Sequence, residues 1–124
     1  MDLDTAITIA VRGHEGFLDK QDKPYILHPL RVMMQMDTID EMIVAVLHDV
    51  IEDTDITIEY LTDAGFDNYI IESIIDLTRL KDEDYFSYIH RLAKNKLARK
   101  VKVADLKDNG FNRNRPCEQS LRDR

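Results

Sequence analysis

A ten-residue stretch, Ala45-Val-Leu-His-Asp-Val-Ile-Glu-Asp-Thr54, sets four ionisable side chains into an apolar run. Side chains four residues apart share one face of an α-helix, so a helix here places Glu52 one turn after His48. Asp53 follows Asp49 in the same way. Burying an imidazole and three carboxylates together is costly unless their charge is compensated, and a divalent cation is the simplest compensation. The stretch therefore predicts half of a metal site, whose other ligands come from elsewhere in the chain.

Size and composition favour one ordinary globular domain over residues 1–124. Of the 124 residues, 44% are hydrophobic and 33% are charged, which suits a single modest core. The apolar runs are too short to cross a bilayer, and the first residues lack the basic start and apolar run of a signal peptide. The one cysteine, Cys117, cannot form an internal disulfide. These features predict a cytoplasmic protein with no membrane partner.

The charge is strongly uneven along the chain. The net charge of −7 argues against a nucleic-acid partner, because duplex binding depends on clustered Lys and Arg. Residues 37–78 contain twelve acids and no Lys or Arg, whereas residues 79–102 contain eight Lys or Arg and three acids. Charge runs are most often solvated faces, here two of opposite sign. The alternative is an acidic metal pocket that faces a basic wall able to hold phosphate.

Apolar residues recur at helical spacing throughout, and no stretch alternates with a period of two, so we predict an all-α, compact multi-helix bundle. Pro29 suits the first turn of a helix, while Gly13 and Gly65 mark helix ends. The expected helices cover residues 3–12, 28–36, 40–53, about 57–64, 67–77, 85–93 and 97–109, followed by a short helix or frayed tail over 112–124. The side chains expected in the core include Met34, Tyr69, Ile75, Phe86, Val103 and Leu106.

Two further positions can complete the metal site. His28 opens a predicted helix, and Asp105 is a carboxylate on an otherwise apolar helix face. With His48 and Asp49 they make a mixed imidazole and carboxylate set, which suits manganese, iron or another first-row cation better than calcium. For any one of these residues a buried hydrogen bond is an equally good explanation. Chance explains all four together poorly.

The sequence resembles the HD-domain phosphohydrolases. Three segments carry the resemblance: Tyr25-Ile-Leu-His-Pro29, Leu47-His-Asp-Val-Ile-Glu-Asp-Thr54 and Lys102-Val-Ala-Asp-Leu-Lys-Asp-Asn109. Their order and spacing over residues 6–109 are most similar to the guanosine tetraphosphate (ppGpp) hydrolase domain of RelA/SpoT-type proteins and to small stand-alone alarmone hydrolases. This resemblance implies an HD-domain bundle that removes the 3′-pyrophosphate of ppGpp or pppGpp, giving GDP or GTP.

The resemblance also implies roles for individual residues. His28, His48, Asp49 and Asp105 match the metal ligands, with manganese the usual ion and iron, zinc, cobalt or nickel as alternatives. Glu52 and Asp53 match the pair that activates the attacking water, although from the residues alone a solvated pair at a helix end is the better explanation. Asn109 matches an asparagine at the substrate. The implied partner is a small nucleotide, and self-association as a homo-oligomer is left open.

The chain departs from the family pattern in three places. The family has two basic residues in an early loop, where this chain has Asp19 and Lys20. Lys81 falls near a family lysine that reaches phosphate, and His14 occupies the place of a histidine in the first helix, for which we expect a supporting or structural role. The chain ends soon after Asn109, so we expect a minimal or truncated domain. The alternatives are another HD-type nucleotide phosphohydrolase and a non-catalytic nucleotide-sensing or interaction module.

Overall fold

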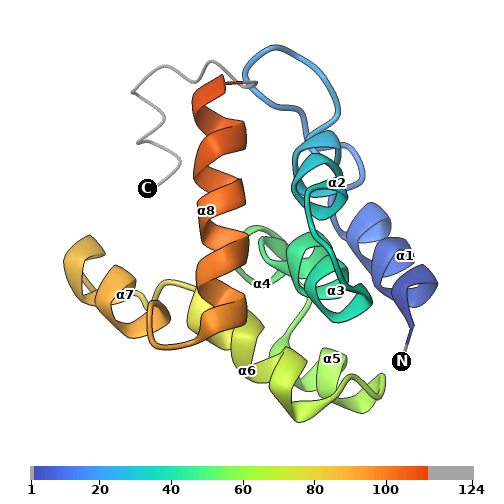
Figure 1. The fold of residues 1–124 in the computed structure, drawn as a ribbon. Helices are drawn as coiled ribbons and strands as arrows, with labels where there is room; N and C mark the ends of the chain where they lie inside the picture. Colours follow the sequence, from blue (N-terminus) through green and yellow to red (C-terminus); the bar gives the residue numbers. More distant parts are fainter. Residues whose placement is uncertain (1, 112–124) are drawn as a thin grey trace.

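The computed structural model describes residues 2–111, which fold into eight helices with no strand among them (Figure 1). The helices are α1 Leu3–Gly13, α2 Leu27–Met34, α3 Ile39–Leu47, α4 Val50–Asp53, α5 Ile58–Asp63, α6 Asn68–Leu77, α7 Tyr85–Leu92 and α8 Lys96–Phe111. The predicted all-α class is confirmed. Among the described residues no helix combines the length and the apolar character needed to cross a bilayer. The prediction for residues 112–124 lies outside the described part of the chain.

Helix α3 is the centre of the fold. The Thr38 hydroxyl accepts from the Glu41 amide and the Glu41 carboxylate accepts from the Thr38 amide, each at 3.2 Å, so the helix begins with a capping box. Residues 43–47 are all buried. The helix packs against α1, α2, α6 and α8. Its carboxyl end, which leads into His48, therefore lies in the interior.

The single helix expected over residues 40–53 is wrong, because the chain turns at His48 and Asp49 between α3 and α4. The Ala45 carbonyl faces His48 Nδ1 at 2.6 Å and also receives the His48 amide, which tightens the backbone locally. Neighbouring side chains on a straight α-helix point about 100° apart. At this interruption His48 Nε2 and Asp49 Oδ1 lie 3.3 Å apart, so the two neighbouring side chains point to one place.

Several apolar side chains that we expected in the core point to solvent. Met34 is 74% exposed and Phe86 is 85% exposed, and the others that are exposed are Tyr69, Ile75, Val103 and Leu106. Each lies on a helix whose buried face is occupied by other apolar residues. In α7, for example, Tyr88 and Leu92 occupy the buried face in place of Phe86. Helical spacing alone does not show which of two apolar faces is covered.

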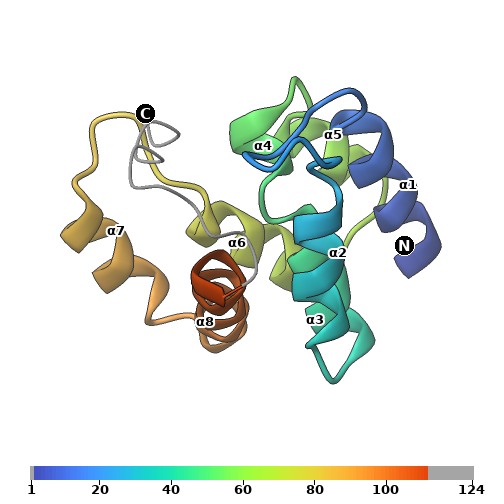
Figure 2. The same ribbon diagram turned by 90° about the horizontal axis from the view of Figure 1, so that it is seen from above.

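Helix α7 lies on the far side of α8 from α1, α2 and α3 (Figures 1 and 2). Its attachment depends on Arg91, which donates to both Glu83 carboxylate oxygens at 2.9 and 2.8 Å and to the Thr78 carbonyl at 3.0 Å. The Tyr88 hydroxyl donates to the Leu77 carbonyl at 2.6 Å. These bonds fix α7 to the link that follows α6.

Replacing Glu83 with glutamine is expected to destabilise the protein at neutral pH but not in acid. The Arg91 guanidinium lowers the pKa of Glu83 to about 2, from 4.5 in an unperturbed carboxyl. The carboxylate therefore contributes stability above pH 4.5, and this contribution is lost as the pH falls towards 2. Thermal unfolding followed by circular dichroism should show a gap between wild type and Glu83→Gln that narrows below about pH 4.5 and closes near pH 2. A gap that stays constant would contradict this account, and Glu59→Gln, on an exposed face of α5, is the matched control.

Candidate metal centre

The four predicted metal ligands meet at one point. His28 comes from α2, His48 and Asp49 from the turn after α3, and Asp105 from α8. One ligand atom from each lies within 4.8 Å of all the others. Asp105 Oδ1 lies 2.8 Å from His28 Nε2 and 3.3 Å from His48 Nε2. Asp49 Oδ1 lies 3.3 Å from His48 Nε2, and Asp49 Oδ2 lies 3.6 Å from His28 Nε2.

This spacing fits a first-row divalent cation. Nitrogen and oxygen ligands at about 2.0–2.2 Å from a common ion are separated from one another by at most about 4.4 Å. The four side chains would therefore need to move by only a few tenths of an ångström to bind one ion. Two carboxylates balance the two charges of the ion. His28, His48 and Asp105 are buried, where unpaired charge is expensive. The cluster can therefore hold a divalent metal ion.

Both histidines are oriented by their other ring nitrogen. His28 Nδ1 donates to Asp108 Oδ2 at 2.6 Å, and Arg31 holds Asp108 with two hydrogen bonds of 2.7 and 3.0 Å. His48 Nδ1 donates to the Ala45 carbonyl. Metal-binding histidines in proteins are usually anchored in this way, which fixes the ring and leaves Nε2 for the ion. The arrangement around both rings therefore supports a metal site.

The cluster is held together by charge. Burial alone would lower the pKa of His48, but the Asp49 and Asp105 carboxylates raise it to about 10. Burial alone would raise the pKa of Asp105, but hydrogen bonds from His28 and His48 place it well below its usual range. The Lys102 ammonium lies 3.3 Å from Asp105 Oδ2 and over the Tyr88 ring. Acids, imidazoles and a lysine thus compensate one another in the interior.

Glu52 and Asp53 lie on α4, one turn after His48 and Asp49. Glu52 Oε2 accepts from the Arg79 amide at 2.6 Å, which joins α4 to the link after α6. The surrounding protein displaces water from the Glu52 carboxyl and raises its pKa, although the side chain keeps access to solvent. Asp53 Oδ2 lies 4.0 Å from His14 Nε2. Their role in activating water stays a prediction.

The substrate residues implied by the resemblance lie on three separate elements. Asn109 is one turn beyond Asp105 on α8, and its buried Oδ1 has no hydrogen-bond partner among the described residues. Lys20 is exposed in the loop between α1 and α2, and Lys81 is exposed in the link between α6 and α7. Asp19 accepts from the amides of Gln21 and Lys23, at 2.8 and 3.0 Å. The acid in the early loop therefore shapes that loop.

Sequence reasoning missed the side chains that support the cluster. Asp108 is fully buried and connects α8 to His28 and Arg31 on α2. The Tyr25 hydroxyl donates to Asp49 Oδ2 at 2.7 Å. Asp108 lies three residues after Asp105, and therefore on the same helix face, which is a signal that could have identified it. Tyr25 has no such local signal, because its partner is 24 residues away.

Replacing Asp108 with asparagine is expected to weaken Mn²⁺ binding by about 10–100-fold, the usual cost of losing an outer partner of a ligand. Asparagine keeps an acceptor for Arg31 but removes the charge that makes His28 Nε2 a stronger ligand. Isothermal titration with Mn²⁺ measures the change, with Asp40→Asn, an exposed acid on α3, as the control. Equal affinities in wild type and Asp108→Asn would show that Asp108 does not act on the metal site.

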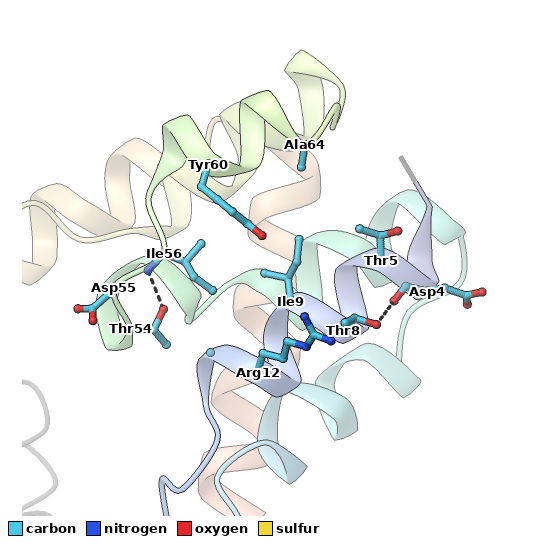
Figure 3. A pocket seen from close by; sticks show the side chains of 11 residues that line it. Asp4, Thr5, Thr8, Ile9, Arg12, Thr54, Asp55, Ile56, Tyr60 and Ala64 are labelled. Atoms are coloured by element: carbon cyan, nitrogen blue, oxygen red, sulfur yellow. Dashed lines mark hydrogen bonds between the residues drawn. The ribbon is translucent and has the colours of Figure 1, made fainter.

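A pocket of about 690 Å³ lies between α1 and α5, and none of the four candidate ligands lines it. Tyr60 of α5 faces Ile9 and Thr8 of α1 across it (Figure 3). Its edge includes residues 54–56, which directly follow Asp53. The pocket is thus lined in part by the segment that directly follows α4.

Comparison with known proteins finds relatives over parts of the chain. No family model matches the chain. A guanosine-3′,5′-bis(diphosphate) 3′-pyrophosphohydrolase of Vibrio cholerae is 38% identical over 77 residues, which are 58% of this chain and 11% of that protein. A probable GTP pyrophosphokinase of Mycobacterium leprae is 30% identical over 113 residues, 81% of this chain and 14% of that protein. The chain thus spans a small part of both relatives.

A solved structure has the same fold. It is described as a metazoan orthologue of SpoT that hydrolyses ppGpp and plays a role in starvation responses. The TM-score is 0.70 with 24% sequence identity, and the match covers 86% of this chain and 66% of that one. The helical bundle described above is therefore a known arrangement.

Proposed function

Because the chain resembles the HD-type hydrolase domain of RelA/SpoT proteins in sequence and in fold, we propose that it is a metal-dependent phosphohydrolase. Its substrate would be ppGpp or pppGpp, from which it removes the 3′-pyrophosphate to leave GDP or GTP. The observation that carries the proposal is the convergence of His28, His48, Asp49 and Asp105, with two further carboxylates one turn beyond.

Each group then has a definite task. The four converging residues would hold the cation, for which manganese is the first candidate, and a bound cation polarises a phosphoryl oxygen and lowers the pKa of a water. Glu52 would accept the proton of the attacking water with Asp53 assisting it, and the raised pKa of Glu52 brings it closer to the working pH of a general base. The Asn109 amide orients a phosphate without adding charge, and Lys20 and Lys81 bind phosphate groups.

The charge around the centre supports a polyphosphate substrate. Asp49, Asp105 and Asp108 supply a dense negative charge, which a bound cation, Arg31 and Lys102 would offset. A tetraphosphate needs additional cations. Arg79 and Lys81, at the start of the basic stretch over residues 79–102, would supply them, and the Glu52–Arg79 bond holds this start beside α4.

The direct test is to incubate metal-free and Mn²⁺-loaded protein with ppGpp and to separate the products by anion-exchange chromatography. The proposal predicts equal amounts of GDP and pyrophosphate, only with the metal. Cleavage of other nucleotides without pyrophosphate release from ppGpp would assign the chain to another HD-type nucleotide phosphohydrolase. Nucleotide binding without turnover would make it a sensing or interaction module, so both results overturn the proposal.

A further inference from the structure

His14 carries a buried polar atom that the site described above does not use. The residue follows α1 and is 2% exposed. Its Nδ1 lies 3.1 Å from the Ala10 carbonyl. A carbonyl can only accept, so Nδ1 holds the proton and Nε2 is left as an acceptor. That Nε2 is buried and has no hydrogen-bond partner among the described residues. Buried polar groups in folded proteins are almost always paired, so this one points to a function.

Nε2 of His14 faces Asp53, whose Oδ2 lies 4.0 Å away. An ionised carboxylate is also only an acceptor, so the two atoms cannot bond directly. One water can donate an O–H to each, because two bonds of about 2.8 Å meeting at roughly a right angle span this separation. Burial lowers the pKa of His14, which keeps its ring neutral and Nε2 available as an acceptor.

The packing around His14 fixes this separation. Its ring lies 5.2 Å from the Tyr25 ring and 5.9 Å from the Phe17 ring, measured between centroids. A Cβ at Gly13 would lie 2.9 Å from Ile56 Cδ1 and 3.4 Å from Thr54 Cγ2, so α1 approaches the segment after Asp53 closely at this glycine. Figure 3 shows Thr54 and Ile56 beside the pocket, which Ile9 of α1 also lines.

We propose that His14 is a positioning residue for Asp53: through one shared water, its Nε2 holds the Asp53 carboxylate in the orientation used to activate the attacking water. This inference rests on the proposed function, in which Asp53 belongs to the activating pair. His14 is not one of the four candidate metal ligands, and its Nε2 faces Asp53. Its loss should therefore affect the rate and leave the binding steps unchanged.

Steady-state kinetics of two variants separate this role from a structural one. His14→Phe keeps a ring and removes both nitrogens, and it should lower kcat by about 10²-fold, the cost of misplacing a reacting group by about 1 Å. KM and Mn²⁺ affinity should stay within about twofold of wild type. His14→Gln, which carries an acceptor at the end of its side chain, should recover most of kcat. The control is Arg12→Gln, at an exposed residue two positions before His14, which should leave kcat unchanged.

A spectroscopic measurement tests the contact without any turnover. Nitrogen-15 resonances of the His14 ring should report a protonated Nδ1 and a hydrogen-bonded acceptor Nε2, and Asp53→Asn should shift the Nε2 resonance. The inference is overturned if Nε2 does not respond to Asp53→Asn, or if folded His14→Phe keeps full kcat or loses Mn²⁺ affinity in parallel with kcat. If the wild-type protein cleaves no nucleotide, the proposed function fails, and the resonances still decide whether His14 and Asp53 are coupled.

Discussion

Asp105→Asn is expected to abolish Mn²⁺ binding and nucleotide hydrolysis and to leave the helical fold intact. Asp105 is the residue that both histidines approach, at 2.8 and 3.3 Å, and the only contribution of α8 to the four-residue cluster. Loss of an outer partner alone costs 10–100-fold in metal affinity, so loss of a carboxylate ligand should cost more than about 100-fold. Activity should fall to the background rate, because the remaining three residues cannot hold the ion firmly.

The fold should survive because asparagine keeps an oxygen that accepts from His28, and because the repulsion between Asp105 and Asp49 disappears. Thermal unfolding with and without Mn²⁺ distinguishes a metal ligand at Asp105 from a structural hydrogen-bond acceptor. At a Mn²⁺ concentration of 100 times its Kd, wild type should gain about 2.7 kcal/mol of stability, and Asp105→Asn should gain none. Collapse of the metal-free variant would instead make Asp105 a structural hydrogen-bond acceptor. Asp40→Asn, which changes an exposed acid, should behave as wild type.

Glu52→Gln is expected to slow hydrolysis by about 10²–10⁴-fold, the usual contribution of a general base, without weakening Mn²⁺ binding. The substitution removes the base and keeps the hydrogen bond that Glu52 makes in the structure. Glutamine retains an oxygen that can accept from the Arg79 amide, so the link between α4 and the start of the basic stretch is kept while the base is removed. The proper measurements are kcat for ppGpp and Mn²⁺ affinity on the same preparations.

Glu52→Ala also tests the structural role of Glu52, because it removes both the base and the acceptor for the Arg79 amide. It should lower the melting temperature, whereas Glu52→Gln should not. If Glu52→Gln kept the full kcat for ppGpp and Asp53→Asn lost most of it, Asp53 and not Glu52 would be the general base. Glu59→Gln, on the exposed face of α5, controls for the loss of one acidic charge.

The parts of the fold that depend on local chemistry were predictable. Caps and glycines marked the ends of the helices, and Thr57, for example, accepts from the Tyr60 amide at the start of α5 as its position indicates. The turn at His48 and Asp49 was not predictable, because the apolar pattern continues through it. The burial of Tyr88 in place of Phe86 depends on where α6 and α8 lie, which the sequence of α7 does not contain.

In the candidate centre, too, the residues with a local sequence signal were predictable and those that depend on packing were not. His28, His48, Asp49 and Asp105 were identified because each places an ionisable group in an apolar helix, and because three segments together match a family pattern. Their partners were missed because the contacts join distant parts of the chain: Asp108 bonds to a histidine 80 residues earlier, and Tyr25 bonds to an acid 24 residues later. Only the packing of α2 against α8 brings Asp108 to His28.

Anomalous X-ray diffraction from crystals of the protein grown with Mn²⁺ tests the central claim most directly. We predict one strong anomalous peak, from a manganese ion bonded to Nε2 of His28, Nε2 of His48 and one oxygen each of Asp49 and Asp105. A peak at any other position, or no peak between these four side chains with Mn²⁺ present in excess, would contradict the metal centre on which the proposed hydrolysis depends.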